Sequence, residues 1–93
     1  MTEADIIAEC REIEKVLIEK NIRYGDSAEN PIRVFSKLPP EAGIRVRIDD
    51  KLSRLRSNLG GDPEDTILDL IGYLILLRIV RAKNPLTKID PQL

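Results

Sequence analysis

Histidine is absent from this chain of 93 residues, and cysteine occurs once, as Cys10. These shortages exclude zinc sites built on imidazole, catalysis by Ser-His-Asp or Cys-His groups, and an internal disulfide framework. Any chemistry must come from carboxylates, lysine, arginine, hydroxyls or a metal ion held by oxygen. Because Cys10 falls on the apolar stripe of a helix, we predict that it is buried in the core.

Aromatic residues and an excess of positive charge are also lacking. The chain has no tryptophan, two tyrosines and one phenylalanine, and 15 Lys and Arg are offset by 16 Asp and Glu. We therefore expect neither base-stacking platforms nor direct binding of duplex nucleic acid by charge. The longest apolar run, Tyr73 to Leu77, is too short to span a bilayer, and the N-terminus is acidic, which predicts a cytoplasmic protein outside the membrane.

Hydrophobic spacing predicts an all-α fold, a small bundle of three main helices. The first helix begins at Thr2, a good N-cap with Asp5 three residues later, and ends near Asn21. Its apolar stripe consists of Ile6, Cys10, Ile13 and Leu17. The second helix runs from Pro40 to Ser57 and is followed by a break from Asn58 to Gly61, in which Gly60-Gly61 is a strong stop.

The third helix is predicted from Pro63, capped by Asp62, to about Ala82. From Ile67 onward it is apolar on nearly every side, and a helix of that kind is buried on every side. One partner layer in a three-helix chain cannot cover it, so we expect a homo-oligomer, most simply a dimer that packs these third helices together. We place a single helical domain at residues 1–83 and an extended C-terminal arm at residues 84–93.

Asp69 is the sharpest functional clue, because a carboxylate in the middle of an apolar helix is costly without a partner. Asp65 lies one turn earlier on the same face, and Gly72 leaves space one turn later. Two carboxylates beside a gap suit Mg²⁺ or Mn²⁺, and Glu64 is close enough to join them. The alternative is that Asp69 pairs with an arginine of the second helix while Glu64 and Asp65 merely complement the helix dipole.

Two further groups are candidates for binding a nucleotide. In the second helix, Arg47, Lys51 and Arg54 can hold phosphates and Asp50 can hold a metal, although Asp50 and Arg54 also fit a solvated ion pair. At the end of the first helix, the second group consists of Asn21, Tyr24, Gly25 and Asp26, where Gly25 allows a tight turn and the tyrosine ring can stack on another ring. The alternative there is an ordinary helix end followed by a turn.

Several motifs in this order resemble MazG-like, all-α nucleoside triphosphate pyrophosphohydrolases, in particular the phage and prophage branch of nucleotide-modification-associated helical domains. The resemblance covers roughly residues 6–81. The motifs are Lys20-Asn21-x-x-Tyr24-Gly25, Arg45-x-Arg47-Ile48-x-Asp50-Lys51-x-x-Arg54-Leu55 and Glu64-Asp65-x-x-x-Asp69-Leu70-x-Gly72-Tyr73.

The resemblance implies a helical dimer, or dimer of dimers, that splits a (deoxy)nucleoside triphosphate into monophosphate and pyrophosphate. A divalent metal, Mg²⁺ or Mn²⁺, would be held by acids at three positions. Cations of the second helix would meet the phosphates, and Glu64 would accept the proton from water. The metal ligands would be Asp50, Asp65 and Asp69, and the phosphate-binding cations Arg47, Lys51 and Arg54.

Two departures separate this chain from the pattern that it resembles. Ser53 stands where the third acid of the usual E-E-x-x-E motif belongs, and Asp65 and Asp69 are one residue farther apart than in the usual E-x-x-D. Nucleotide binding is therefore the stronger expectation, and catalysis the weaker one. The alternatives are a non-catalytic nucleotide sensor or sponge on the same scaffold, or a phage regulator that acts through protein partners in the bacterial cytoplasm.

Overall fold

A computed structural model describes residues 1–32, 35–58 and 61–84 of the chain. Within these ranges the protein is all-helical, without strands, which confirms the predicted fold class. The helices are α1 (Glu3–Tyr24), α2 (Pro40–Ser57) and α3 (Pro63–Lys83). In this part of the chain no helix has the length and apolar character needed to cross a membrane. Except for Asn84, the predicted C-terminal arm lies outside the described residues.

Helix α1 begins with the predicted N-cap. The Thr2 hydroxyl accepts a hydrogen bond from the Asp5 amide at 3.2 Å, and the Asp5 carboxylate accepts one from the Thr2 amide at 2.8 Å. The helix ends at Tyr24, later than the predicted end near Asn21. The helix ends there because Gly25, at φ 61°, adopts the left-handed conformation and donates its backbone N–H to the Asn21 carbonyl.

The boundaries of α2 agree with the prediction, and α3 extends one residue beyond it. Pro40 fits the first turn of α2, because its fixed φ suits a helix and its missing N–H would be unpaired there in any case. Asn58, the first residue of the predicted break, ends α2 in the left-handed conformation at φ 62°. Asp62 caps α3 by accepting a hydrogen bond from the Glu64 amide at 3.0 Å.

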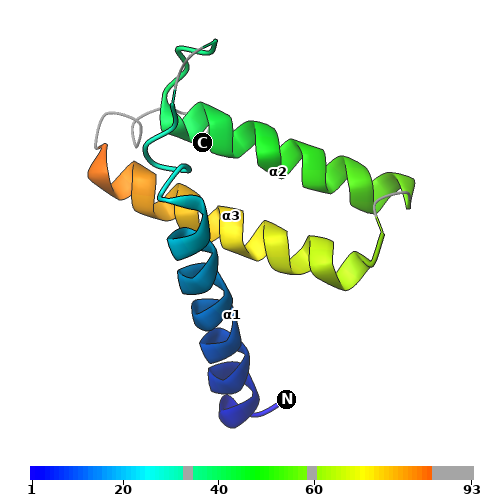
Figure 1. Ribbon diagram of the computed structural model, residues 1–93. Coiled ribbons are helices and arrows are strands. Elements are labelled where there is room, and N and C mark those ends of the chain that lie inside the picture. The colour runs from blue at the N-terminus through cyan, green and yellow to red at the C-terminus, as the bar shows by residue number, and fades with distance from the viewer. Residues whose placement is uncertain (33–34, 59–60, 85–93) are drawn as a thin grey trace.

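Helices α2 and α3 form an antiparallel hairpin. The N-terminal half of α1 projects away from this hairpin, and its C-terminal half crosses α3 (Figure 1). The apolar core is small: Ile44 of α2, Val80 of α3 and Ile13 of α1 are the buried hydrophobic side chains among the described residues. Such a core leaves much of the apolar surface of the chain uncovered.

A buried carboxylate closes the end of the hairpin where α2 begins and α3 ends. Glu41 is only 9 % exposed and faces two arginines, with its Oε2 3.3 Å from Arg45 and its Oε1 3.7 Å from Arg81. Because Arg81 belongs to α3, this pair connects the two helices directly. A buried charge needs such partners, so the cluster also fixes which ends of the helices meet.

The crossing of α1 over α3 occurs at Gly72. A Cβ atom added to Gly72 would stand 2.8 Å from Cδ2 of Leu17, closer than carbon atoms can pack. The space that we predicted beside Gly72 is therefore occupied by a side chain of α1. The absence of a side chain at this position is what allows the two helices to approach.

Cys10 is exposed, so the prediction that it belongs to the core is wrong. Residues 3–12 of α1 are all exposed. Figure 1 shows this half of the helix extending away from α2 and α3. A helical stripe predicts that one face is apolar, but it does not tell how far along the helix a partner extends. Among the described residues, α3 likewise has exposed apolar side chains on one face, at Ile67, Leu74 and Ile75.

Two glycine-to-alanine variants test the crossing. Gly43 of α2 has open space around its Cα, so Gly43→Ala should raise the free energy of unfolding by about 0.5–1 kcal/mol through helix propensity alone. Gly72→Ala has the same intrinsic gain but meets Leu17, and overpacking costs about 1–3 kcal/mol. We expect it to be neutral or destabilising in urea unfolding. Equal stabilisation by both variants would contradict the crossing.

Candidate functional site

A pocket of about 420 Å³ lies where the three helices meet. An apolar wall is formed by Ile13, Val16 and Leu17 of α1 together with Leu68 and Leu76 of α3. The remaining walls carry polar and charged groups from all three helices and from the turn after α1. Pockets that bind small organic ligands combine these features: an apolar surface with a few convergent polar groups, at a volume of roughly 300–1,000 Å³.

The charged residues of the pocket leave it net positive. Three cations line it, Lys20, Arg47 and Lys51, against the carboxylates of Asp26 and Asp69. The whole chain has a formal charge of −1, so the positive charge is a local property of this pocket. A concave cationic site inside a nearly neutral protein favours an anionic ligand.

Asp69 lies between the two lysines. Its Oδ1 is 2.7 Å from the ammonium group of Lys20, and its Oδ2 is 3.4 Å from that of Lys51. Its side chain is 26 % exposed, whereas that of Lys51 is only 15 % exposed, so the second pair is largely shielded from water. The alternative prediction was that Asp69 forms an ion pair with an arginine of the second helix. Asp69 does form ion pairs, but its partners are lysines, one of α1 and one of α2.

These contacts determine the charge of Asp69. Partial burial on its own raises the pKa of this carboxyl, but the hydrogen bonds and charges of Lys20 and Lys51 together outweigh it. The pKa of Asp69 consequently lies below its ordinary value, and the group is an anion at neutral pH.

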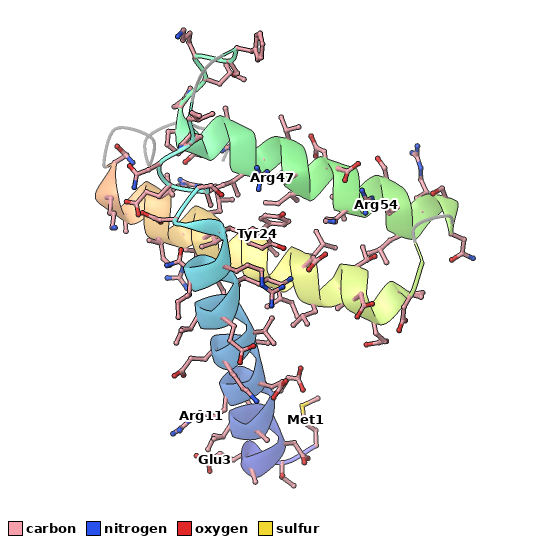
Figure 2. The ribbon with its side chains drawn as sticks, in the orientation of Figure 1. Met1, Glu3, Arg11, Tyr24, Arg47 and Arg54 are labelled. Atoms are coloured by element: carbon pink, nitrogen blue, oxygen red, sulfur yellow. The ribbon has the colours of Figure 1, made fainter. Side chains whose placement is uncertain are left out.

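Arg47 is the cation of the pocket that no carboxylate neutralises within the described ranges. Its guanidinium carbon is 6.0 Å from the centre of the Tyr73 ring, a cation–π distance. Figure 2 shows Arg47 on the same side of the hairpin as Tyr24, while Arg54 lies farther along α2. A planar guanidinium held against a ring is well placed to bind a phosphate with two parallel hydrogen bonds.

The pocket gathers five of the nine residues that the sequence nominated: Asn21, Tyr24, Arg47, Lys51 and Asp69. The other four are not part of its lining. Arg54 pairs with Asp50 at 3.3 Å on the exposed side of α2, as the alternative interpretation of that stripe held. Glu64 and Asp65 are exposed in the first turn of α3.

The acids nominated as metal ligands do not form a cage as they stand. Among the described residues no three Asp, Glu or Cys side chains come together as a metal-binding group. Both oxygens of Asp69 face ammonium groups, and Oδ2 of Asp50 faces Arg54. Since a divalent cation needs several oxygens directed at one point, we derive no catalytic step through a metal from this geometry.

Asp26, which the sequence grouped with Asn21 and Tyr24, also lines the pocket, whereas Lys20 and Tyr73 line it without having been assigned a role. A signal for Lys20 was available. It follows Leu17 by three positions and Ile13 by seven, so it lies on the apolar stripe of α1, where an ammonium group needs a partner. Tyr73 becomes recognisable only once α3 is placed beside Arg47 of α2.

No protein-family model, curated protein or solved structure matches the chain. The function is therefore inferred from the geometry of the pocket and the charges within it.

The stability contributed by Asp69 should depend on pH. Ionised Asp69 stabilises the fold above its unfolded pKa of about 3.9, and this contribution is lost as the pH falls through the lower folded value. Asp69→Asn should therefore lower the free energy of unfolding by about 1–2 kcal/mol at pH 7, and the deficit should shrink below about pH 4.

Urea unfolding followed by circular dichroism between pH 7 and pH 3 measures this difference. Asp49→Asn, at an exposed position of α2, is the matched control and should change stability by less than about 0.5 kcal/mol. A deficit for Asp69→Asn that stays constant across the whole range would show that the ion pairs with Lys20 and Lys51 are not its cause.

Proposed function

We propose that the protein binds a (deoxy)nucleoside triphosphate in the pocket between its three helices. The observation that carries the proposal is the meeting of three cations and two tyrosines around an apolar wall, in a cavity of about 420 Å³. The cations suit the phosphates, and the rings and the apolar wall suit a base and its sugar. The resemblance described in the sequence analysis, which several of these same residues carry, implies the same class of ligand.

The phosphate end of the ligand belongs near Arg47 and the lysine pair. Arg47 has donors that no carboxylate occupies in the described part of the chain, whereas Lys20 and Lys51 already share Asp69. Asp69 therefore holds the two ammonium groups in place and cancels part of their charge. A triphosphate carries more negative charge than a single carboxylate, so it can share the lysines with Asp69.

The base end belongs against Tyr24 and Tyr73. Both rings line the pocket, and Asn21, Asp26 and Ser27 offer amide, carboxylate and hydroxyl groups at the end of α1 and in the turn after it. An aromatic face binds any base by stacking, and polar groups beside it read the edge of the base.

Metal-dependent hydrolysis of the nucleotide to monophosphate and pyrophosphate is the second candidate function. The observation that favours it is the exposure of Glu64 and Asp65 one turn before Asp69, without an ion-pair partner in the described ranges. A metal arriving with the substrate could use them, but Asp69 would have to release its lysines. The two functions thus assign different roles to Asp69. In the first its negative charge weakens the binding of an anion, and in the second it is a metal ligand.

Removal of Arg47 tests nucleotide binding. Titration calorimetry with a panel of NTPs and dNTPs should show binding by the wild type, and Arg47→Ala should weaken it about tenfold or more, because a charged hydrogen-bonding group is lost. Arg56→Ala removes an exposed arginine of α2 that is not in the pocket lining and should bind like the wild type. Nucleosides and inorganic tripolyphosphate, tested alone, should bind more weakly than the nucleotide.

Two results would reject this proposal. One is the absence of binding by any nucleotide of the panel, which would leave a regulator acting through protein partners. The other is binding of tripolyphosphate as tight as that of the nucleotides, because the tyrosines and the apolar wall would then contribute nothing.

Asp69→Asn separates the two candidate functions. If Asp69 only restrains the lysines, the variant removes a negative charge from the pocket and should bind nucleotide more tightly than the wild type. If Asp69 is a metal ligand, release of pyrophosphate with Mg²⁺ or Mn²⁺ should fall by at least about a hundredfold in the variant. Wild-type protein that binds nucleotides but releases no pyrophosphate would reject hydrolysis alone.

A further inference from the structure

We propose that two copies of this chain form a two-fold dimer in which the projecting half of α1 packs on the open face of α3 in its partner. The arm denotes residues 3–12 of α1. The open face denotes Ile67, Ile71, Leu74, Ile75 and Arg78 of α3. The proposal goes beyond nucleotide binding, because it concerns a surface that the pocket does not use.

The open face is the third side of α3. Its members recur at helical spacing, so they lie together on one side of the helix. The other sides face α2 and the α1 crossing at Gly72, where burial is deepest. On the open face, by contrast, Ile67, Leu74 and Ile75 are 40 %, 49 % and 36 % exposed. An aliphatic strip of this kind marks a contact surface.

The arm presents a matching strip. Ile6 and Cys10 continue the stripe by which Ile13 and Leu17 pack on α3, yet Ile6 is 53 % exposed and Cys10 is exposed as well. Met1, Glu3 and Arg11 stand clear of the hairpin in Figure 2. A helical segment this short is marginal in water without a partner, although its N-terminus carries a complete capping box.

The charges of the two surfaces are complementary. The arm carries Glu3 and Glu9 three positions to either side of Ile6, beside the apolar stripe. The open face carries Arg78 among its aliphatic residues, without a carboxylate partner in the described part of the chain. The arm of a second copy places Glu3 and Glu9 near that arginine. The same contact forms twice across a two-fold axis, which closes the assembly as a dimer.

The surface of the chain is large enough for such an interface. The chain exposes 7411 Å², whereas a compact monomer of 10.5 kDa exposes about 5,400 Å². A stable interface buries roughly 800 Å² on each partner. A contact of that size between two copies would bring the exposed area of each subunit closer to that of a compact protein.

Charge reversal tests the contact. Wild-type protein should sediment as a dimer at micromolar concentration. The arm variant Glu3→Lys with Glu9→Lys and, separately, Arg78→Glu should each raise the dissociation constant about tenfold or more, through repulsion between like charges. Mixing the two variants should restore the dimer, because each lysine-bearing arm then meets a glutamate and each wild-type arm meets Arg78. Arg56→Glu, on the exposed side of α2, is the control and should remain dimeric.

Cys10 provides a second measurement, as it is the sole thiol of the chain and lies in the arm. Its reaction with a maleimide should be at least about tenfold slower in the wild-type dimer than in Arg78→Glu, and slow again in the mixture of variants. Circular dichroism verifies that the variants keep their helices. A monomeric wild type, a dimer that neither reversal weakens, or a mixture that stays monomeric would overturn the proposal. Each of these results is independent of whether the pocket binds nucleotide.

Discussion

The carboxylate of Asp69 is the point at which all three helices meet electrostatically. It belongs to α3 and holds Lys20 of α1 at 2.7 Å and Lys51 of α2 at 3.4 Å. With an apolar core of only a few buried side chains, this three-way contact orients α1 against the hairpin. It also places two cations on the wall of the pocket, so the interaction that positions the helices is the one that gives the site its charge.

The crossing of α1 at Gly72 has two consequences for function. On one side of the crossing, the C-terminal half of α1 and the turn after it close the pocket with Lys20, Asn21 and Tyr24. On the other side, the N-terminal half extends beyond α3 with an apolar stripe that is exposed within the described part of the chain (Figure 1). A single helix thus serves the proposed ligand site at one end and the proposed dimer contact at the other.

Local signals in the sequence predicted the helices well, because caps and turns are determined by residues close in the chain. Thr2 with Asp5, Pro40, and Asp62 with Pro63 all mark helix starts that the structure contains. Predictions that depended on distant neighbours succeeded less often. Cys10 was assigned to the core from its place on an apolar stripe, yet it is exposed because α3 does not reach that far.

The sequence by itself determined the helical class, the helix starts and the need of Asp69 for a partner, since each follows from local geometry or from the cost of a charge in an apolar helix. Only the tertiary structure decided which partner Asp69 has and which nominated residues share a pocket. Asn21 and Arg47 belong to helices joined by a long loop, and no spacing rule brings them together. That meeting depends on the crossing at Gly72, where a missing side chain lets α1 approach α3.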